Sequence, residues 1–218
     1  MTQPVNSSDW RHDNRIENPL TSNSTLNFLG HIFLTPNDDE ILLGNFIADS
    51  VKGNPEKFYS GKIVEGIRFH RAIDEFTDKH PLVKQGAARF RNTQSRYATV
   101  VIDVIYDHIL ASKWTEFHTL ELNDLAQSVY QRLEAQSNHF PAPVKRYFPY
   151  MQEQNWLYNY QFEWGILKAL EGLDRRSANE TQMHLALDVY KESEAEFLAE
   201  FREFIADAQQ MSRNYFSG

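Results

Sequence analysis

Apolar side chains recur every three or four residues along most of the chain, which is the spacing of one face of an α-helix. In the first half this pattern predicts four helices, bounded by capping residues, glycines and prolines. They run from about Glu40 to the stop at Gly53-Asn54-Pro55, from Gly61 to Lys79, from Pro81 to about Thr93, and from about Tyr97 to Lys113. Asp38 or Asp39 can cap the first of them through its side-chain oxygen.

The segment from Tyr97 to Lys113 is dense in apolar residues. Its many β-branched residues leave a strand as the alternative, but a run of 17 residues without a turn favours a helix. We therefore expect this segment to be the central helix of the fold.

The second half of the chain continues the helical pattern, interrupted at Pro141, Pro143 and Gly172. The further predicted helices lie at about 121–137, 143–158, 160–172 and 180–210. Strand alternation, hairpin turns and internal repeats are absent from the sequence. The prediction is an all-α, single-domain helical bundle of about seven or eight helices.

The first 23 residues are polar and show no apolar period, so 1–23 is predicted to be a disordered N-terminal extension. The helical domain would then occupy 24–218. Order should begin at Leu26-Asn27-Phe28-Leu29. In this interpretation His31 lies in an apolar stretch before the first helix, and a turn follows at Thr35-Pro36-Asn37.

The composition narrows the possible functions. The chain has 218 residues, enough for one well-buried core, and its lack of cysteine excludes disulfides and thiolate metal ligands. No apolar run is long enough to span a bilayer, and no signal-peptide pattern opens the chain, so we expect a cytoplasmic protein without membrane contact. A formal net charge of -8 argues against nucleic-acid binding.

The charge is unevenly distributed along the chain. Between Lys52 and Arg96 there are ten Lys or Arg and five Asp or Glu residues, a local charge of +5 that leaves -13 for the remainder. This asymmetry favours an anionic substrate or partner that meets one face of the protein. A solvated basic helix face is an equally good interpretation.

Histidines and aspartates interrupt the apolar faces of the predicted helices. Residues four apart on a helix are separated by only about 40° around its axis, so His70 lies directly beside Asp74. Asp103 and Asp107 repeat this spacing on the apolar helix. The candidate catalytic residues and metal ligands are Asp49, His70, Asp74, Asp103, Asp107 and His108, and His31 and Asp78 are further candidates for the metal.

Carboxylates in helices this apolar are costly to bury unless a cation or several hydrogen-bond donors accompany them. A divalent metal ion would meet that need, and imidazole with carboxylate oxygen suits Mn²⁺, Mg²⁺, Fe²⁺ or Co²⁺. Buried ion pairs are the alternative, and His31 is explained equally well as a ligand or as a core histidine. Arg68 and Arg71 flank His70 and are candidates to bind a substrate phosphate, while Asn45 is a candidate to orient a ligand or water.

Several short motifs carry a resemblance to a known family. They are Asn27-Phe28-Leu29-Gly30-His31, Gly44-Asn45-Phe46-Ile47-Ala48-Asp49, Gly53-Asn54-Pro55, Gly66 with His70-Arg71-Ala72-Ile73-Asp74, Thr77-Asp78, and Asp103-Val104-Ile105-Tyr106-Asp107-His108. From about Leu26 to the C-terminal helix, the chain resembles the acyl carrier protein phosphodiesterase family. The polar segment before Leu26 departs from the family pattern.

This resemblance implies an HD-like helical fold and a distant relation to the HD-type metal phosphohydrolases. It implies hydrolysis of the phosphodiester that joins 4'-phosphopantetheine to the serine of holo-acyl carrier protein, with Mn²⁺ as the favoured ion. The motif that names the HD enzymes corresponds to Asp107 and His108, which stand here in the reverse order. The alternatives are a metal-dependent phosphohydrolase acting on a nucleotide or another small phosphoester, and a non-catalytic helical module.

Overall fold

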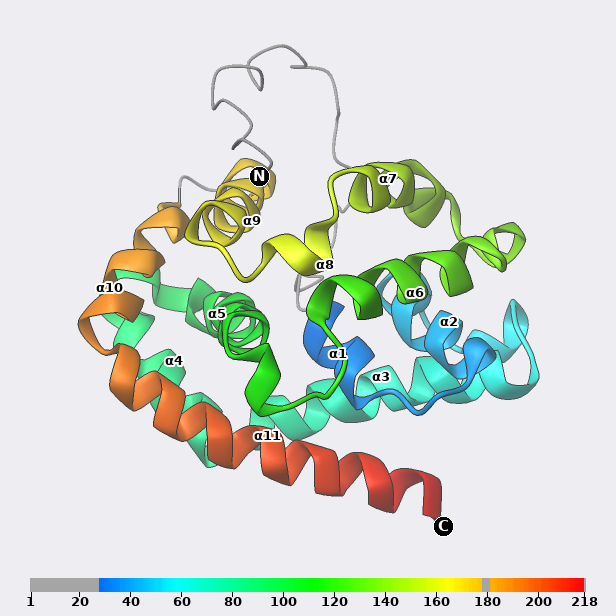
Figure 1. Ribbon diagram of the computed structural model, residues 1–218, viewed down its shortest axis with the longest axis horizontal. Coiled ribbons are helices and arrows are strands. Elements are labelled where there is room, and N and C mark those ends of the chain that lie inside the picture. Colours follow the sequence, from blue (N-terminus) through cyan, green and yellow to red (C-terminus); the bar gives the residue numbers. More distant parts are fainter. Residues whose placement is uncertain (1–27, 178–180, 218) are drawn as a thin grey trace.

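A computed structural model describes residues 28–177 and 181–217 of the protein (Figure 1). This part of the chain contains eleven α-helices joined by short 3₁₀ helices and loops, and no strand. The α-helices are α1 (Phe28–Leu34), α2 (Asp39–Ile47), α3 (Gly61–Lys79), α4 (Pro81–Gln94), α5 (Ala98–Ser112), α6 (Leu122–Glu134), α7 (Ala142–Glu153), α8 (Trp156–Asn159), α9 (Glu163–Arg176), α10 (Ala186–Glu192) and α11 (Glu194–Ser217). The predicted all-α fold is confirmed, while the predicted extension at 1–23 lies outside the described residues.

The structure divides the chain more finely than the apolar pattern predicts. The segment around His31 is itself a helix, α1, although it was expected to be an apolar stretch that precedes the first helix. The predicted helix at 143–158 breaks at Asn155, which has the left-handed φ of 48°. The predicted helix at 180–210 divides at Ser193 into α10 and α11. Such interruptions of one turn or less leave the apolar period almost unchanged, so the sequence pattern does not reveal them.

Helix α5 forms the centre of the fold, as its composition predicts. Its residues Val101, Ile102, Val104, Ile105 and Ile109 are completely buried. Helices α1, α4, α9, α10 and α11 all pack against it, and Figure 1 shows α5 almost end-on among them. None of the described helices is both long enough and apolar enough to cross a membrane.

Helices α2 and α3 cross at unusually short range because each contributes a glycine to the contact. A β-carbon at Gly44 would lie 2.1 Å from the carbonyl oxygen of Ile63, and one at Gly66 would lie 2.2 Å from the carbonyl oxygen of Ile41. Only glycine permits backbones to approach so closely. The crossing places the side chain of Asn45, on α2, beside that of His70, on α3.

The start of α2 is fixed by the predicted cap. Asp38 Oδ1 accepts hydrogen bonds from the backbone N–H groups of Glu40 and Ile41, each at 3.1 Å. Its other oxygen pairs with Lys62 of α3 at 2.6 Å. These contacts hold the pKa of Asp38 below its usual value, chiefly through Lys62. The cap therefore also ties the beginning of α2 to α3.

Candidate metal centre

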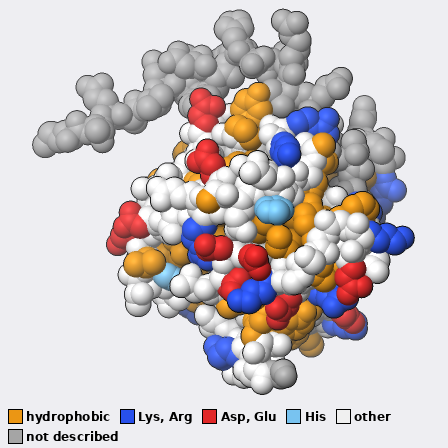
Figure 2. Space-filling model, turned by 90° about the vertical axis from the view of Figure 1, so that its right-hand side faces the viewer, with side chains coloured by type: hydrophobic (Ala, Val, Ile, Leu, Met, Phe, Trp, Pro, Cys, Tyr) orange, Lys and Arg blue, Asp and Glu red, His pale blue; other side chains and the backbone are white. Residues whose placement is uncertain are grey.

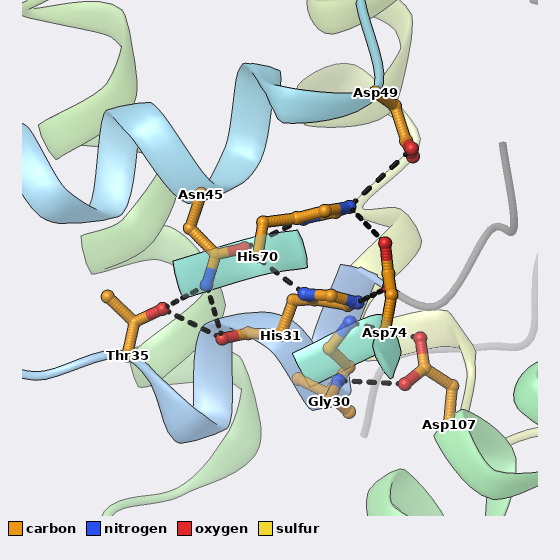
Figure 3. Close-up of polar contacts among 9 residues, drawn as sticks. Gly30, His31, Thr35, Asn45, Asp49, His70, Asp74 and Asp107 are labelled. Atoms are coloured by element: carbon orange, nitrogen blue, oxygen red, sulfur yellow. Dashed lines mark hydrogen bonds and ion pairs between the residues drawn. The ribbon is translucent and has the colours of Figure 1, made fainter. Parts of the chain in front are cut away.

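Two imidazole rings and two carboxylates meet where α1, α3 and the 3₁₀ helix η1 (Ala48–Ser50) converge (Figure 3). The rings of His31 and His70 stack, with centroids 3.9 Å apart and an interplanar angle of 22°. Asp74 spans both rings: one oxygen lies 3.2 Å from Nε2 of His31 and the other 3.4 Å from Nε2 of His70. Asp49, from η1, approaches Nε2 of His70 to 3.5 Å. One oxygen of Asp74 and one nitrogen from each ring lie within 4.8 Å of one another.

The site is buried on its histidine side and open on its carboxylate side. The side chains of His31 and His70 are 5% and 8% exposed, whereas those of Asp49 and Asp74 are 28% and 42% exposed. Both Nε2 atoms are buried and lack a hydrogen-bond partner among the residues that the structure describes. The two partly exposed carboxylates therefore mark the side of the site that solvent reaches.

Asn45 lies behind the two rings, on the side away from the carboxylates. Its Oδ1 is 3.1 Å from Nδ1 of His31 and 2.9 Å from Nδ1 of His70. Its Nδ2 donates to the backbone carbonyl of His31 at 3.2 Å and to the hydroxyl of Thr35 at 2.7 Å. Asn45 is 2% exposed, so the contacts of its amide are made inside the protein.

The environment shifts the pKa values of the two histidines in opposite directions. Burial, together with the nearby His70, lowers the pKa of His31. Burial also acts to lower the pKa of His70, but Asp49 and Asp74 outweigh it and the pKa is raised. Burial opposes the ionisation of Asp74, yet its contacts with the two rings hold its pKa below the usual value. Negative charge therefore collects at the open side of the site.

Two aspartates of α5 border this cluster without entering it. Asp107 binds the start of α1, because its oxygens accept from the N–H groups of Leu29 at 3.0 Å and Gly30 at 2.7 Å. Burial raises its pKa to about 7 despite these hydrogen bonds. Asp103 lines the same small cavity as His31 and Asp107. Burial and the charges of nearby aspartates raise the pKa of Asp103 well above its usual value.

Two further candidates from the sequence make no direct contact with the four residues of the cluster. His108 points to a different side of α5 from Asp107, where its Nδ1 is 2.7 Å from the carbonyl oxygen of Tyr160 and its ring packs edge-on against Tyr190. Asp78 is exposed at the end of α3, one turn beyond Asp74. The structure thus brings together His31, His70, Asp74 and Asp49, and places Asp103 and Asp107 beside them. It turns His108 away from them, and it leaves Asp78 outside the cluster but close enough for its charge to raise the pKa of Asp103.

The candidate phosphate-binding arginines differ in their surroundings. Arg68 is paired with Glu56 at 2.6 Å. Arg71 is exposed and donates one hydrogen bond, at 2.9 Å, to the carbonyl oxygen of Val51, two residues after Asp49. In the part of the chain that is described, no ion pair engages Arg71. Its remaining donors are therefore available at the edge of the site.

Acidic side chains neutralise part of the basic segment at 52–96. Four of its cations are neutralised by ion pairs with acidic side chains, and they are Lys62, Arg68, Lys79 and Arg89. On the face drawn in Figure 2, acidic and basic side chains alternate with hydrophobic ones. Arg71 is among the cations of the segment that no ion pair engages in the described residues.

Sequence reasoning missed the role of Thr35 in the site, whereas it left Tyr147 with two interpretations, a residue of a substrate groove or a residue of the core. Thr35, expected in a turn, accepts from Asn45 and donates to the carbonyl oxygen of His31 at 2.8 Å. Its signal was the spacing of four residues from His31, which places a hydroxyl over that carbonyl once the segment is helical. Tyr147 of α7 packs against Phe28 and Phe46. Burial raises its pKa, and so does the charge of Asp49.

Comparison with known proteins agrees with the motifs. Residues 26–208 match the family model described as acyl carrier protein phosphodiesterase. A protein of that name from Photorhabdus laumondii is 33% identical over 190 residues, covering 87% of this chain and 96% of its own. One from Yersinia pestis is 35% identical over 152 residues, covering 69% and 79%, respectively. No solved structure matches the chain, so the HD-like fold stays a prediction.

Proposed function

The chain belongs to the acyl carrier protein phosphodiesterase family, and we propose that it acts on holo-acyl carrier protein with a divalent metal ion held between α1, η1 and α3. The reaction releases 4'-phosphopantetheine and leaves apo-acyl carrier protein. The proposed ligands are His31, His70, Asp74 and Asp49. Asp103 and Asp107 are proposed to support them from α5, and the reaction is expected to take place in the cytoplasm.

The observation that carries the metal proposal is the state of the two imidazole Nε2 atoms. Both are buried without a hydrogen-bond partner in the described residues, yet carboxylate oxygens lie 3.2 to 3.5 Å away. Buried polar atoms in folded proteins are nearly always paired, so two orphans that face carboxylates require an explanation. A cation between the nitrogens and the oxygens would explain why both nitrogens lack a partner.

The spacing and chemistry of the donors fit a first-row or alkaline-earth divalent ion. With metal–ligand bonds of about 2.1 Å, neighbouring donor atoms are separated by roughly 3.0 to 3.4 Å. The nitrogen–oxygen distances in the cluster, 3.2 Å, 3.4 Å and 3.5 Å, are close to that range. Two imidazoles and two carboxylates suit a borderline ion, so we propose Mn²⁺, with Mg²⁺, Fe²⁺ or Co²⁺ as alternatives.

His31, His70, Asp74 and Asp49 would hold the divalent ion, which would supply an activated water and offset the charge that develops on the phosphoryl oxygens. In the overall reaction the water oxygen forms a bond to phosphorus, and the bond between phosphorus and the serine oxygen breaks. The serine oxygen takes up a proton and remains on the carrier protein. The exposed edges of Asp49 and Asp74 mark where both the water and the phosphodiester would enter.

Arg71 is the proposed contact for the phosphate or for the carrier protein itself. Its guanidinium is exposed and held to the carbonyl oxygen of Val51, so it is fixed close to the residues that precede that carbonyl, including Asp49. A guanidinium offers paired donors that match phosphate oxygens. Arg68 is a weaker choice because Glu56 already pairs with it.

The direct test is the mass of holo-acyl carrier protein after incubation with the protein and Mn²⁺. We expect loss of the 4'-phosphopantetheine group, no loss when EDTA is present, and no loss with Asp74→Ala. Glu75→Ala is the matched control, since it removes a neighbouring carboxylate that is exposed and paired with Lys79. This variant should retain full turnover.

Other results would test the substrate and the metal requirement separately. An unchanged mass under every divalent ion, for a folded protein, would exclude the carrier-protein reaction. Turnover that persists after exhaustive chelation would support the carrier-protein reaction and refute the requirement for a metal ion. Hydrolysis of nucleotides or other small phosphoesters, with holo-acyl carrier protein left intact, would identify a different substrate for the same site.

A further inference from the structure

We propose that Asn45 is a positioning residue that fixes both histidines of the site in one tautomer, with hydrogen on Nδ1 and a free lone pair on Nε2. A single amide oxygen accepts from two stacked imidazole rings, at 3.1 Å from His31 and 2.9 Å from His70. This inference rests on the proposed metal site. It assigns the preparation of that site to a residue that does not touch the ion.

The orientation of the amide is determined by its nitrogen. Nδ2 of Asn45 donates to the carbonyl oxygen of His31 and also lies 2.7 Å from the hydroxyl of Thr35. If the amide were turned over, its oxygen would face the lone pairs of that carbonyl oxygen, and a buried acceptor would be opposed by another acceptor. The oxygen must therefore point toward the two rings.

An amide oxygen accepts hydrogen bonds and cannot donate them. Each ring nitrogen that faces it must therefore carry the hydrogen. A neutral imidazole has only one N–H, so the opposite nitrogen, Nε2, presents a lone pair. In both histidines that lone pair points toward the carboxylates of Asp74 or Asp49. One side chain thus prepares two ligands.

Thr35 makes the arrangement rigid. Its hydroxyl donates to the carbonyl oxygen of His31 at 2.8 Å and accepts from Asn45, which closes a small ring of hydrogen bonds around the amide. Groups that hold metal-binding histidines by the second ring nitrogen typically change metal affinity by about 10- to 100-fold when removed. We expect an effect of this size from Asn45.

The test reads the tautomers directly in the metal-free protein. Nitrogen chemical shifts and two-bond couplings of ¹⁵N-labelled histidine distinguish hydrogen on Nδ1 from hydrogen on Nε2. They would be recorded at alkaline pH, where the rings are neutral, and Mn²⁺ affinity would be measured in parallel by titration calorimetry. The parent protein should show the Nδ1–H pattern for both His31 and His70.

Two substitutions separate positioning from packing. Asn45→Leu keeps the branched shape of the side chain and removes the acceptor, so the Nδ1–H pattern should be lost and Mn²⁺ affinity should fall by about 10- to 100-fold. Asn45→Asp retains an acceptor oxygen for both rings, so the tautomer pattern and most of the affinity should survive even if the fold loses stability. Gln94→Leu is the matched control, since it removes another buried amide, bound to the carbonyl oxygen of Gln182.

The outcomes are distinct. If Asn45→Leu leaves the Nδ1–H signals of both histidines unchanged, Asn45 does not position them and the inference fails. If Gln94→Leu lowers Mn²⁺ affinity as much as Asn45→Leu, the effect is one of general stability and the inference also fails. If the parent shows both Nδ1–H tautomers and binds no divalent ion, the proposed metal site fails while the role of Asn45 in fixing the rings stands.

Discussion

Asp107 accepts a hydrogen bond from the backbone N–H of Gly30 at 2.7 Å, across 77 positions of sequence. It accepts a second one from Leu29 at 3.0 Å. The first N–H groups of a helix lack partners within it, and a carboxylate also interacts favourably with the positive end of the helix dipole. Asp107 therefore acts as a remote cap for α1, the short helix that carries His31.

The first prediction follows from this cap. Asp107→Ala leaves two N–H groups at the start of α1 without an acceptor, so the free energy of unfolding should fall by about 1 to 3 kcal/mol. Mn²⁺ affinity should fall with it, because the position of His31 is no longer fixed. Urea denaturation of the metal-free protein measures the first effect. Unchanged stability together with lost Mn²⁺ binding would instead identify Asp107 as a direct ligand.

Much of the fold follows from local sequence signals. The predicted bounds of α3, Gly61 and Lys79, agree with the structure, because a glycine precedes its apolar period and His80-Pro81 stops it. The cap of α2 is Asp38, one of the two candidates that the sequence offered. Helix α1 escaped prediction because it has only seven residues and its start is capped by a residue of α5. Its stability therefore depends on tertiary contacts that local patterns do not contain.

The site shows the same division between local and long-range information. The spacing of His70 and Asp74 in the sequence predicts that they lie side by side on one helix, and the 3.4 Å between His70 Nε2 and the carboxylate of Asp74 confirms it. The pairing of His31 with His70 is not predicted in this way, because it depends on how α1 and α3 pack. His108 follows Asp107 directly, but successive residues on a helix point about 100° apart, and only Asp107 faces α1.

The second prediction concerns pH and Asp103. Burial and the neighbouring Asp74, Asp78 and Asp107 raise the pKa of Asp103 in the folded protein well above its usual value. The folded state then holds this proton more tightly than the unfolded state, so the contribution of Asp103 to stability decreases as pH rises above about 4. Because asparagine does not ionise, Asp103→Asn removes this decrease in stability with rising pH. The variant should gain stability relative to the parent between acidic and neutral pH.

Urea denaturation at a series of pH values, with EDTA present, measures this difference. The gain should be small near pH 4 and should increase toward neutral pH until it levels off above the pKa of the folded protein. Addition of Mn²⁺ should reduce the advantage of the variant, since a nearby cation relieves the same repulsion. A stability difference that does not change with pH would contradict the raised pKa.

The third prediction tests the close crossing of α2 and α3. In Gly66→Ala, the new methyl group would lie 2.2 Å from the carbonyl oxygen of Ile41, which is backbone and cannot rotate away. The helices must separate, which should lower the free energy of unfolding by about 1 to 3 kcal/mol or more and weaken the contact between Asn45 and His70. Thermal denaturation and Mn²⁺ affinity measure the two effects.

Gly172→Ala in α9 is the matched control for this substitution. The nearest atom to the added methyl group would be on Arg175, at 3.8 Å, which is an ordinary contact. Alanine favours a helix over glycine by about 1 kcal/mol, so this variant should be as stable as the parent or slightly more stable. Equal losses from both substitutions would refute the idea that backbone proximity is the cause.

The fourth prediction distinguishes the two arginines that flank His70. Arg71→Gln removes an exposed guanidinium that no ion pair engages in the described chain, so KM for holo-acyl carrier protein should rise about ten-fold. Arg68→Gln removes a cation already paired with Glu56 and should change KM by much less. Steady-state kinetics measures both. A fall in kcat and in Mn²⁺ affinity with unchanged KM would mean that Arg71 acts instead by holding Val51, and through it the backbone around Asp49.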